Sequence, residues 1–284
     1  MDSLREIDRW DVRNAAVGLL TEGGRLETYG DTSRKFRWAS VTKLVTALAS
    51  LVALEEGTLD LDDPAGPPGS TIKHLLAHAS GLPFLDGEPI IGSPSERRVY
   101  SNVGFNALGA ELATEAGIPF EEYVRVAVFE PLGMNGSGLL LDEKYGAPAA
   151  GGYGPLDDLI LLAAEFMKPT LVAEETLDEA VTVAFPSLDG ILPGFGRQRP
   201  NDWGLGIELR GTKSPHWTGT NNSRRTFGHF GGAGTFLWVD PQARCALVCL
   251  TNRAFDTWAA EVWPPFSDAV LAELAGAAAE QSSG

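Results

Sequence analysis

The order of strand-like and helix-like segments is the feature that most restricts the possible folds of this chain. Strand patterns occur near the N-terminus and return after about residue 200, at 15–20, 26–29, 203–210, 234–239 and 246–251. Between them, helical patterns predominate. Strands at both ends of a chain can pair in one sheet, with the helical region inserted between them. We therefore expect an α/β (α+β) fold with one antiparallel sheet built from both termini, flanked by helices, and a mostly helical inserted lobe.

Helical segments are marked by caps, prolines and glycines at their ends. They are expected at 3–10, from 41 to 56, from 70 or 71 to 79, from 103 to 116, from 119 to 130, from 155 to 167 and from 266 to 279. We expect a single domain over residues 1–284. Its sheet lobe would comprise about 1–57 and 185–284, and its helical lobe about 58–184. A site is expected in the cleft between them.

Composition excludes several classes of function. The net charge is −16, and the pI is about 4.6, which disfavours nucleic acids and anionic membranes as partners. The N-terminus lacks the basic and apolar segments of an export signal. The longest apolar stretch, residues 44–54, is too short to span a bilayer. These observations predict a cytoplasmic protein; the oligomeric state is left open.

The two cysteines lie four residues apart in one strand pattern. Cys245 and Cys249 would be roughly 13 Å apart on a strand, whereas a disulfide needs Cα atoms within about 7 Å. We expect two reduced, buried thiols, which fits a cytoplasmic location.

One motif places a hydroxyl beside an amine. Ser40-Val-Thr-Lys43 matches S-x-x-K at the start of an apolar helix. Residues three apart share a helix face, so Lys43 can reach the Ser40 hydroxyl. A desolvated lysine can lose its proton and activate a nucleophile.

The same pattern recurs at Ser70-Thr-Ile-Lys73. Here a simpler interpretation suffices, because Ser70 follows a proline- and glycine-rich turn and can serve as a helix N-cap. Ser40 is therefore favoured as the nucleophile.

Two further motifs could complete a catalytic site. In Tyr100-Ser-Asn102, the phenol could relay protons and the amide could orient Lys43 and a substrate carbonyl. Taken alone, the motif is also typical of a loop with an asparagine helix cap. In His229-Phe230-Gly231-Gly232, glycines would let a substrate approach the backbone, although the segment alone is typical of a glycine-rich turn.

Other patterns carry less weight. His74 and His78 have metal-ligand spacing, but Leu75 replaces the glutamate of the zincin pattern. Neither a metal nor an organic cofactor is implied. The aromatic segment 203–217, which includes His216, could wall a pocket or pack against the sheet.

In combination, Ser40-x-x-Lys43, Tyr100-x-Asn102 and His229-x-Gly231 resemble the serine β-lactamase and penicillin-binding-protein superfamily. The closest branch is that of class C β-lactamases and related esterases. Flanking segments agree with the resemblance, which extends from about residue 15 to 275. They are 36–40, 71–83, 130–134 and 250–253.

The resemblance implies a β-lactamase/transpeptidase-like fold and roles for the motif residues. Ser40 would be the nucleophile, Lys43 and Tyr100 would share the role of base, and Asn102 would position the substrate. His229 would occupy the place of the third motif's basic residue. The backbone N–H groups of Ser40 and Gly232 would form an oxyanion hole.

One position departs from the family pattern. The third motif usually has a hydroxyl residue that binds the substrate carboxylate, and Phe230 stands there. The sequence thus favours esterase activity by a serine hydrolase that forms an acyl-enzyme on a small-molecule ester or amide. Alternatives are a true β-lactamase, a D-alanyl carboxypeptidase, an acyltransferase or a catalytically silent binding protein.

Overall fold

A six-stranded antiparallel sheet joins the two ends of the chain. The computed structural model describes residues 1–140 and 144–282. The strand order is β2-β1-β11-β10-β9-β8, and Ala15 in the first strand pairs with Thr251 in the last. The expected sheet from both termini is confirmed. Its strands are β1 (Ala15–Thr21), β2 (Leu26–Gly30), β8 (Glu208–Leu209), β9 (Phe227–Gly231), β10 (Thr235–Asp240) and β11 (Cys245–Thr251).

Helices cover both faces of this sheet, which explains why β11 is buried at every residue. Cys245, Leu247 and Cys249 pack in a core with α9 (Thr257–Ser282) and the short 3-10 helix Ser3–Arg9. The alternate residues of β11 pack in a second core with α7 (Leu156–Met167) and α1 (Thr42–Glu55). Successive strand residues point to opposite faces, so one strand serves both cores. Cys245 and Cys249 are free and buried, as expected.

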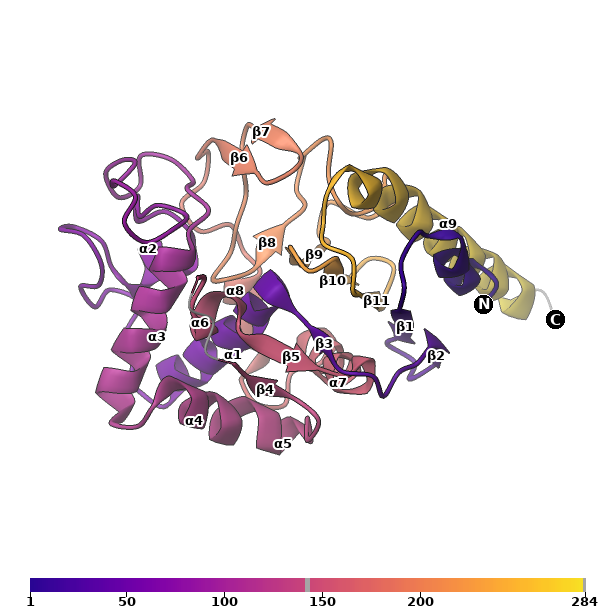
Figure 1. Cartoon of the computed structure of the whole chain (residues 1–284), viewed down its shortest axis with the longest axis horizontal. Helices are drawn as coiled ribbons and strands as arrows, with labels where there is room; N and C mark the ends of the chain where they lie inside the picture. The colour runs from indigo at the N-terminus through magenta and orange to yellow at the C-terminus, as the bar shows by residue number, and fades with distance from the viewer. Residues whose placement is uncertain (141–143, 283–284) are drawn as a thin grey trace.

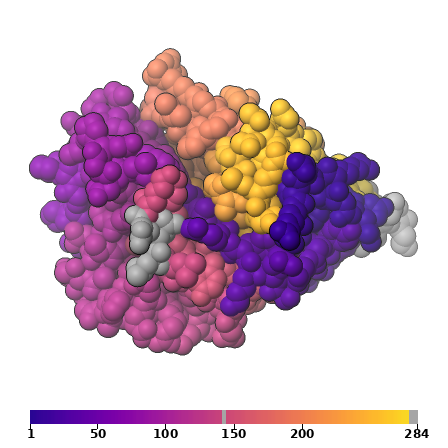
Figure 2. Space-filling model, viewed as in Figure 1, coloured from indigo at the N-terminus to yellow at the C-terminus, as the bar shows by residue number. Residues whose placement is uncertain are grey.

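The central helix α1 is buried continuously from Thr42 to Ala53. The remaining helices are α2 (Ile72–Leu76), α3 (Asn102–Ala116), α4 (Phe120–Val124), α5 (Glu130–Leu132), α6 (Ala147–Ala150) and α8 (Glu174–Ala180). Although the residues of α1 were expected in the sheet lobe, Figure 1 shows α1 packed among α3, α4 and α6, and Figure 2 shows the N-terminal and C-terminal segments lying together away from these helices.

Two small sheets complete the fold. The strands β3 (Phe36–Arg37), β5 (Gly152–Gly154) and β4 (Gly138–Leu139) form one of them. The other is a hairpin of β6 (Gly190–Leu192) and β7 (Gly196–Gln198). None of the helices within the described residues combines the length and the apolar character needed to cross a membrane.

The expected strand at 203–210 is wrong over most of its length. Trp203 forms a bridge with Glu208, and the Gly204 N–H donates to the Ile207 carbonyl at 2.9 Å. The segment therefore turns back on itself. Gly206, at φ +77°, adopts a left-handed conformation that permits this turn, and only Glu208–Leu209 joins the sheet.

Several helix boundaries also differ from expectation. The helix expected to reach residue 79 ends at Leu76, and His78 follows with φ +53°. The helix expected over 119–130 contains a π-helical turn at Arg125–Phe129. The last helix begins at Thr257 and continues through Pro264 and Pro265, although prolines usually interrupt a helix.

Candidate active site

Ser40 lies in a strained turn that leads into α1. It belongs to a 3-10 turn at Ala39–Val41, and Ala39 has φ +47°, which is costly for a residue other than glycine. Hydrogen bonds hold the turn from two sides. The Thr235 hydroxyl donates to the Trp38 carbonyl at 2.8 Å, and the Thr42 hydroxyl donates to the Ala39 carbonyl at 2.5 Å. The serine is thus fixed at the junction of α1 and the sheet.

Lys43 lies one turn further on, with its side chain completely buried. Its Nζ is 3.4 Å from Ser40 Oγ, 2.7 Å from Asn102 Oδ1 and 2.9 Å from the Ala149 carbonyl oxygen. None of the carboxylates among the described residues contacts Nζ, and burial lowers the pKa of Lys43 well below the ordinary lysine value. Burial therefore shifts the protonation equilibrium of Lys43 toward the neutral amine.

The Tyr100-Ser101-Asn102 motif enters the site at the start of α3. The alternative interpretation had Asn102 as the cap of this helix, and it is wrong. Ser101 caps the helix, because its Oγ accepts the Gly104 N–H at 2.8 Å. Asn102 is thereby free to bind Lys43. Tyr100 lines the same pocket as Ser40, and its ring centroid lies 4.8 Å from Lys43 Nζ. Burial raises the pKa of Tyr100, so its phenol stays protonated.

The third motif spans the end of strand β9 and the turn after it, so its interpretation as a glycine-rich turn holds for Gly232 but not for His229 and Phe230. Gly231 lies so close to the nucleophile turn that a Cβ atom there would be 2.2 Å from the Trp38 carbonyl oxygen and 3.2 Å from Ser40 N. Gly232 follows the strand, and its carbonyl accepts the Phe255 N–H at 3.0 Å. The absence of a side chain at Gly231 permits the contact between β9 and the turn that contains Ser40.

Ser40 opens onto a small cavity of about 130 Å³ with mostly apolar walls. The lining includes side chains from the loop before α3, the β6–β7 hairpin, β9 and the segment before α9. The lining residues are Ser40, Phe84, Tyr100, Leu192, Pro193, Trp203, Glu208, His229, Phe230, Gly232 and Phe255. The cavity thus brings together the predicted residues Ser40, Tyr100, His229, Phe230 and Gly232, with Lys43 and Asn102 directly behind the serine.

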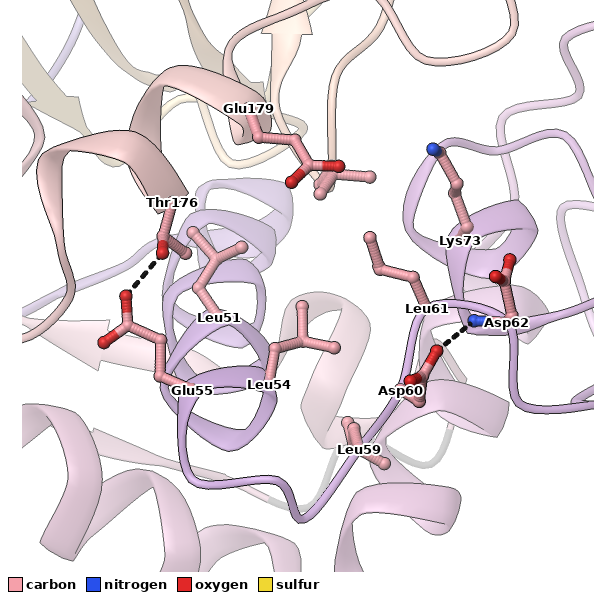
Figure 3. Close-up of a pocket in the computed structure, with 11 residues that line it drawn as sticks. Leu51, Leu54, Glu55, Leu59, Asp60, Leu61, Asp62, Lys73, Thr176 and Glu179 are labelled. Carbon is pink, nitrogen blue, oxygen red and sulfur yellow. Dashed lines mark hydrogen bonds between the residues drawn. The ribbon is translucent and has the colours of Figure 1, made fainter.

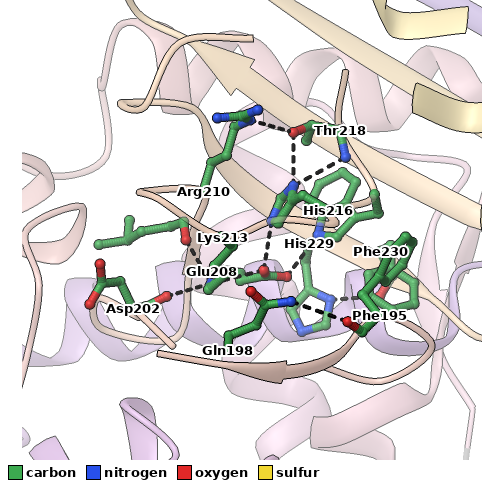
Figure 4. A network of polar contacts seen from close by, with 12 residues as sticks. Phe195, Gln198, Asp202, Glu208, Arg210, Lys213, His216, Thr218, His229 and Phe230 are labelled. Atoms are coloured by element: carbon green, nitrogen blue, oxygen red, sulfur yellow. Dashed lines mark hydrogen bonds and ion pairs between the residues drawn. The ribbon is translucent and has the colours of Figure 1, made fainter. Parts of the chain in front are cut away.

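One wall contains a buried charged network that sequence reasoning missed. Lys213 Nζ lies 2.9 Å from Glu208 Oε1, His216 Nε2 lies 2.9 Å from the same oxygen, and the Trp217 indole N–H donates to Glu208 Oε2 at 2.8 Å (Figure 4). Burial alone would raise the pKa of Glu208, but the Lys213 ammonium and His216 outweigh it and hold this pKa below its usual range. The network joins residues that are close in sequence, but only the turn at 203–208 brings Glu208 to the cavity.

The aromatic segment 203–217 serves both of its expected uses. Trp203 lines the cavity, while Trp217 packs 5.8 Å from Phe230 and 6.1 Å from Phe236, measured between ring centroids. The start of the segment therefore forms part of the cavity wall, and its end packs against the sheet.

The second S-x-x-K motif has a different geometry. Ser70 is buried, its Oγ has no hydrogen-bond partner among the described residues, and Thr71 rather than Ser70 is the N-cap of α2. Lys73 lines another cavity, of about 430 Å³, together with Glu55, Asp62 and Glu179 (Figure 3). This larger cavity contains none of the predicted site residues.

The remaining candidates lie apart from Ser40 or have structural partners. His74 accepts the Thr71 N–H at 3.2 Å, and His78 accepts the Ser101 N–H at 3.1 Å. Over residues 1–140 and 144–282, no group of three potential ligands could hold a metal ion.

Known proteins support the resemblance seen in the motifs. A β-lactamase from Mycobacterium bovis superposes with a TM-score of 0.92 and is 50% identical, over 96% of this chain and 99% of that one. Penicillin-binding protein 4* of Bacillus subtilis (strain 168) is 30% identical over 136 residues, which are 37% of this chain and 30% of that protein. The D-alanyl-D-alanine-carboxypeptidase/endopeptidase AmpH of Escherichia coli (strain K12) is 28% identical over 134 residues, 34% of this chain and 35% of that protein.

The alignments thus span about a third of the length of these two curated relatives. The family described as Beta-lactamase matches residues 15–272. Because this match extends over most of the sequence and includes all three motifs, the chain belongs to the β-lactamase family of serine hydrolases.

Proposed function

We propose that the chain hydrolyses small neutral esters through an acyl-enzyme on Ser40. The observation that carries this proposal is the convergence of Ser40, Lys43 and Tyr100 at one small, mostly apolar cavity. In the proposed reaction, Ser40 Oγ attacks the ester carbonyl carbon, the alcohol leaves with a proton, and water then releases the acid.

Lys43 is proposed as the base that takes the Ser40 proton. A neutral amine has two N–H bonds and one lone pair. The two short contacts of Nζ, to Asn102 Oδ1 and the Ala149 carbonyl, match the two N–H donors. The third and longest contact, to Ser40 Oγ, then faces the lone pair. Burial supports this state by lowering the pKa of Lys43.

Tyr100 and the backbone are proposed to complete the chemistry. The Tyr100 phenol, which lines the cavity with Ser40 and lies close to Lys43, would pass a proton between Lys43 and the leaving alcohol. Asn102 would orient Lys43 and the substrate. The N–H groups of Ser40 and Gly232 are proposed to stabilise the oxyanion, where one lost donor typically costs about 10²- to 10³-fold in kcat.

The proposed preference for neutral esters rests on what the cavity lacks. Phe230 has no hydroxyl to bind a substrate carboxylate, which forgoes a charge-assisted hydrogen bond worth roughly 1.5–3 kcal/mol. This corresponds to about 10- to 150-fold in binding. Burial lowers the pKa of His229 to about 3, so this side chain supplies no positive charge at neutral pH.

A comparison of two substrates tests the proposal. We expect kcat/KM for p-nitrophenyl butyrate to exceed that for nitrocefin by at least tenfold, with both activities absent in Ser40→Ala. If the missing hydroxyl causes the ester preference, Phe230→Thr should lower the ratio of kcat/KM for p-nitrophenyl butyrate to that for nitrocefin. Thermal unfolding checks that the variant is folded. Equal turnover of nitrocefin by the wild-type protein would contradict the ester preference and extend to this chain the activity for which the M. bovis protein is named.

A further inference from the structure

The cavity contains an unpaired hydrogen-bond acceptor at His229. This side chain is 2% exposed, and its Nδ1 lies 2.6 Å from the Phe230 carbonyl oxygen. A carbonyl oxygen can only accept, so Nδ1 carries the proton and Nε2 has a free lone pair. Nε2 is buried and has no partner within the described residues. Figure 4 draws the imidazole beside the Glu208 network with its single hydrogen bond, to Phe230.

Trp203 contributes an unpaired donor to the same cavity. Its side chain is 1% exposed, and its indole N–H has no acceptor among the described residues. The Trp203 and His229 rings are in edge contact, with centroids 5.4 Å apart. Buried polar groups without partners are rare in native proteins and call for an explanation. Here one acceptor and one donor without partners among the described residues belong to two side chains that contact each other and line one cavity.

The charges around this corner do not favour an ionic ligand. The three N–H bonds of the Lys213 ammonium are directed to the Asp202 carbonyl, Glu208 Oε1 and the Leu209 carbonyl, at 2.7, 2.9 and 2.6 Å. Lys213 therefore has no donor left for a substrate carboxylate. Its charge also balances that of Glu208, so a substrate ammonium meets no net negative charge.

We propose that the His229–Trp203 corner binds a hydroxyl group of the substrate, which donates to His229 Nε2 and accepts from the Trp203 indole N–H. A hydroxyl can do both, whereas an ammonium only donates and a carboxylate only accepts. This inference rests on the proposed function and narrows its substrate class to hydroxylated neutral esters. The hydroxyl takes part in no covalent step.

Two pairs of esters test the inference, each comparing a hydroxyl with a methyl group of similar size. The first pair is ethyl 3-hydroxybutyrate and ethyl 3-methylbutyrate, and the second is 2-hydroxyethyl butyrate and propyl butyrate. Acid release is followed by pH-stat. In at least one pair, we expect kcat/KM of the hydroxylated ester to be about 3- to 10-fold higher, the range for a neutral hydrogen bond.

Three variants assign the preference to the corner. His229→Leu, which removes the acceptor, and Trp203→Phe, which removes only the donor, should each lower the hydroxyl-to-methyl ratio. His229→Gln provides an amide oxygen as acceptor and should retain part of the preference for the hydroxylated ester. The inference is overturned if neither pair favours the hydroxyl, or if the ratio is unchanged in both His229→Leu and Trp203→Phe. Absence of turnover for all four esters, with Ser40 unlabelled by a fluorophosphonate, would overturn the proposed function and this inference with it.

Discussion

The Asn102 side-chain oxygen lies 2.7 Å from Lys43 Nζ and fixes the orientation of a buried amine. Asn102 is available for this contact because Ser101 caps α3 in its place. The relationship links two motifs that are separated by 59 residues in the chain. In the proposed mechanism, this contact directs one N–H of Lys43 away from Ser40 and leaves the lone pair of the neutral amine to the serine.

Lys43 and Tyr100 should act as a unit, because both are proposed to move the proton of Ser40. Lys43→Ala and Tyr100→Phe should each reduce kcat/KM on p-nitrophenyl butyrate strongly. The double variant should lose little more than the worse single one, since groups that act together are strongly non-additive. A double variant whose loss in kcat/KM equals the product of the two single losses would contradict the cooperation of Lys43 and Tyr100. Circular dichroism of all three variants provides the control for folding.

The pH dependence of kcat/KM should report the deprotonation of Lys43. The ammonium has no lone pair, so activity should fall as pH decreases through the Lys43 pKa and reach a plateau above it. Burial lowers this pKa well below 10.5, so the plateau should begin well below that pH. Lys43→Arg should be inactive across the range, because arginine stays protonated. A wild-type rate that still rises steeply near pH 10 would contradict this role.

Gly231 should be far less tolerant of substitution than its neighbour. A Cβ atom at Gly231 would lie 2.2 Å from the Trp38 carbonyl oxygen, whereas one at Gly232 meets nothing within 4 Å. Gly231→Ala should lower the free energy of unfolding by about 1–3 kcal/mol, as overpacking does. Gly232→Ala is the matched control and should change it by less than about 0.5 kcal/mol. Urea denaturation measures both, and equal effects would contradict the close approach of sheet and turn.

The buried pair of Glu208 and Lys213 should be sensitive to removal of one partner. Lys213→Met leaves the Glu208 carboxylate without its ammonium and should lower the free energy of unfolding by roughly 3–5 kcal/mol. Glu208→Gln combined with Lys213→Met removes both charges and should cost less than Lys213→Met alone. Urea denaturation of the two variants decides this, and a double variant that is less stable than the single one would indicate that the pair is not coupled.

Much of the architecture could be predicted from local patterns. Residues 15–20 and 246–251 alternate or run apolar as buried strands do, and the structure pairs them within one sheet. The S-x-x-K spacing predicted that Lys43 would reach Ser40, and Nζ lies 3.4 Å from Ser40 Oγ although Ser40 belongs to the 3-10 turn before α1.

A local turn and a contact distant in sequence could not be predicted from the pattern of residues. Trp203–Arg210 has strand-like residues, but Gly204 and Gly206 allow a turn that places Glu208 against Lys213 and His216. Likewise, the alternation of hydrophobic residues gave no indication that Ala149 would supply a carbonyl to Lys43, since α6 reaches α1 only through tertiary packing.

The central claim is that Ser40 is the nucleophile, and intact-mass spectrometry after exposure to a fluorophosphonate tests it most directly. The wild-type protein and Ser70→Ala should each gain the mass of a single phosphonyl group. Ser40→Ala should gain none while retaining the wild-type circular dichroism spectrum. Labelling that persists in Ser40→Ala and disappears in Ser70→Ala would contradict the assignment.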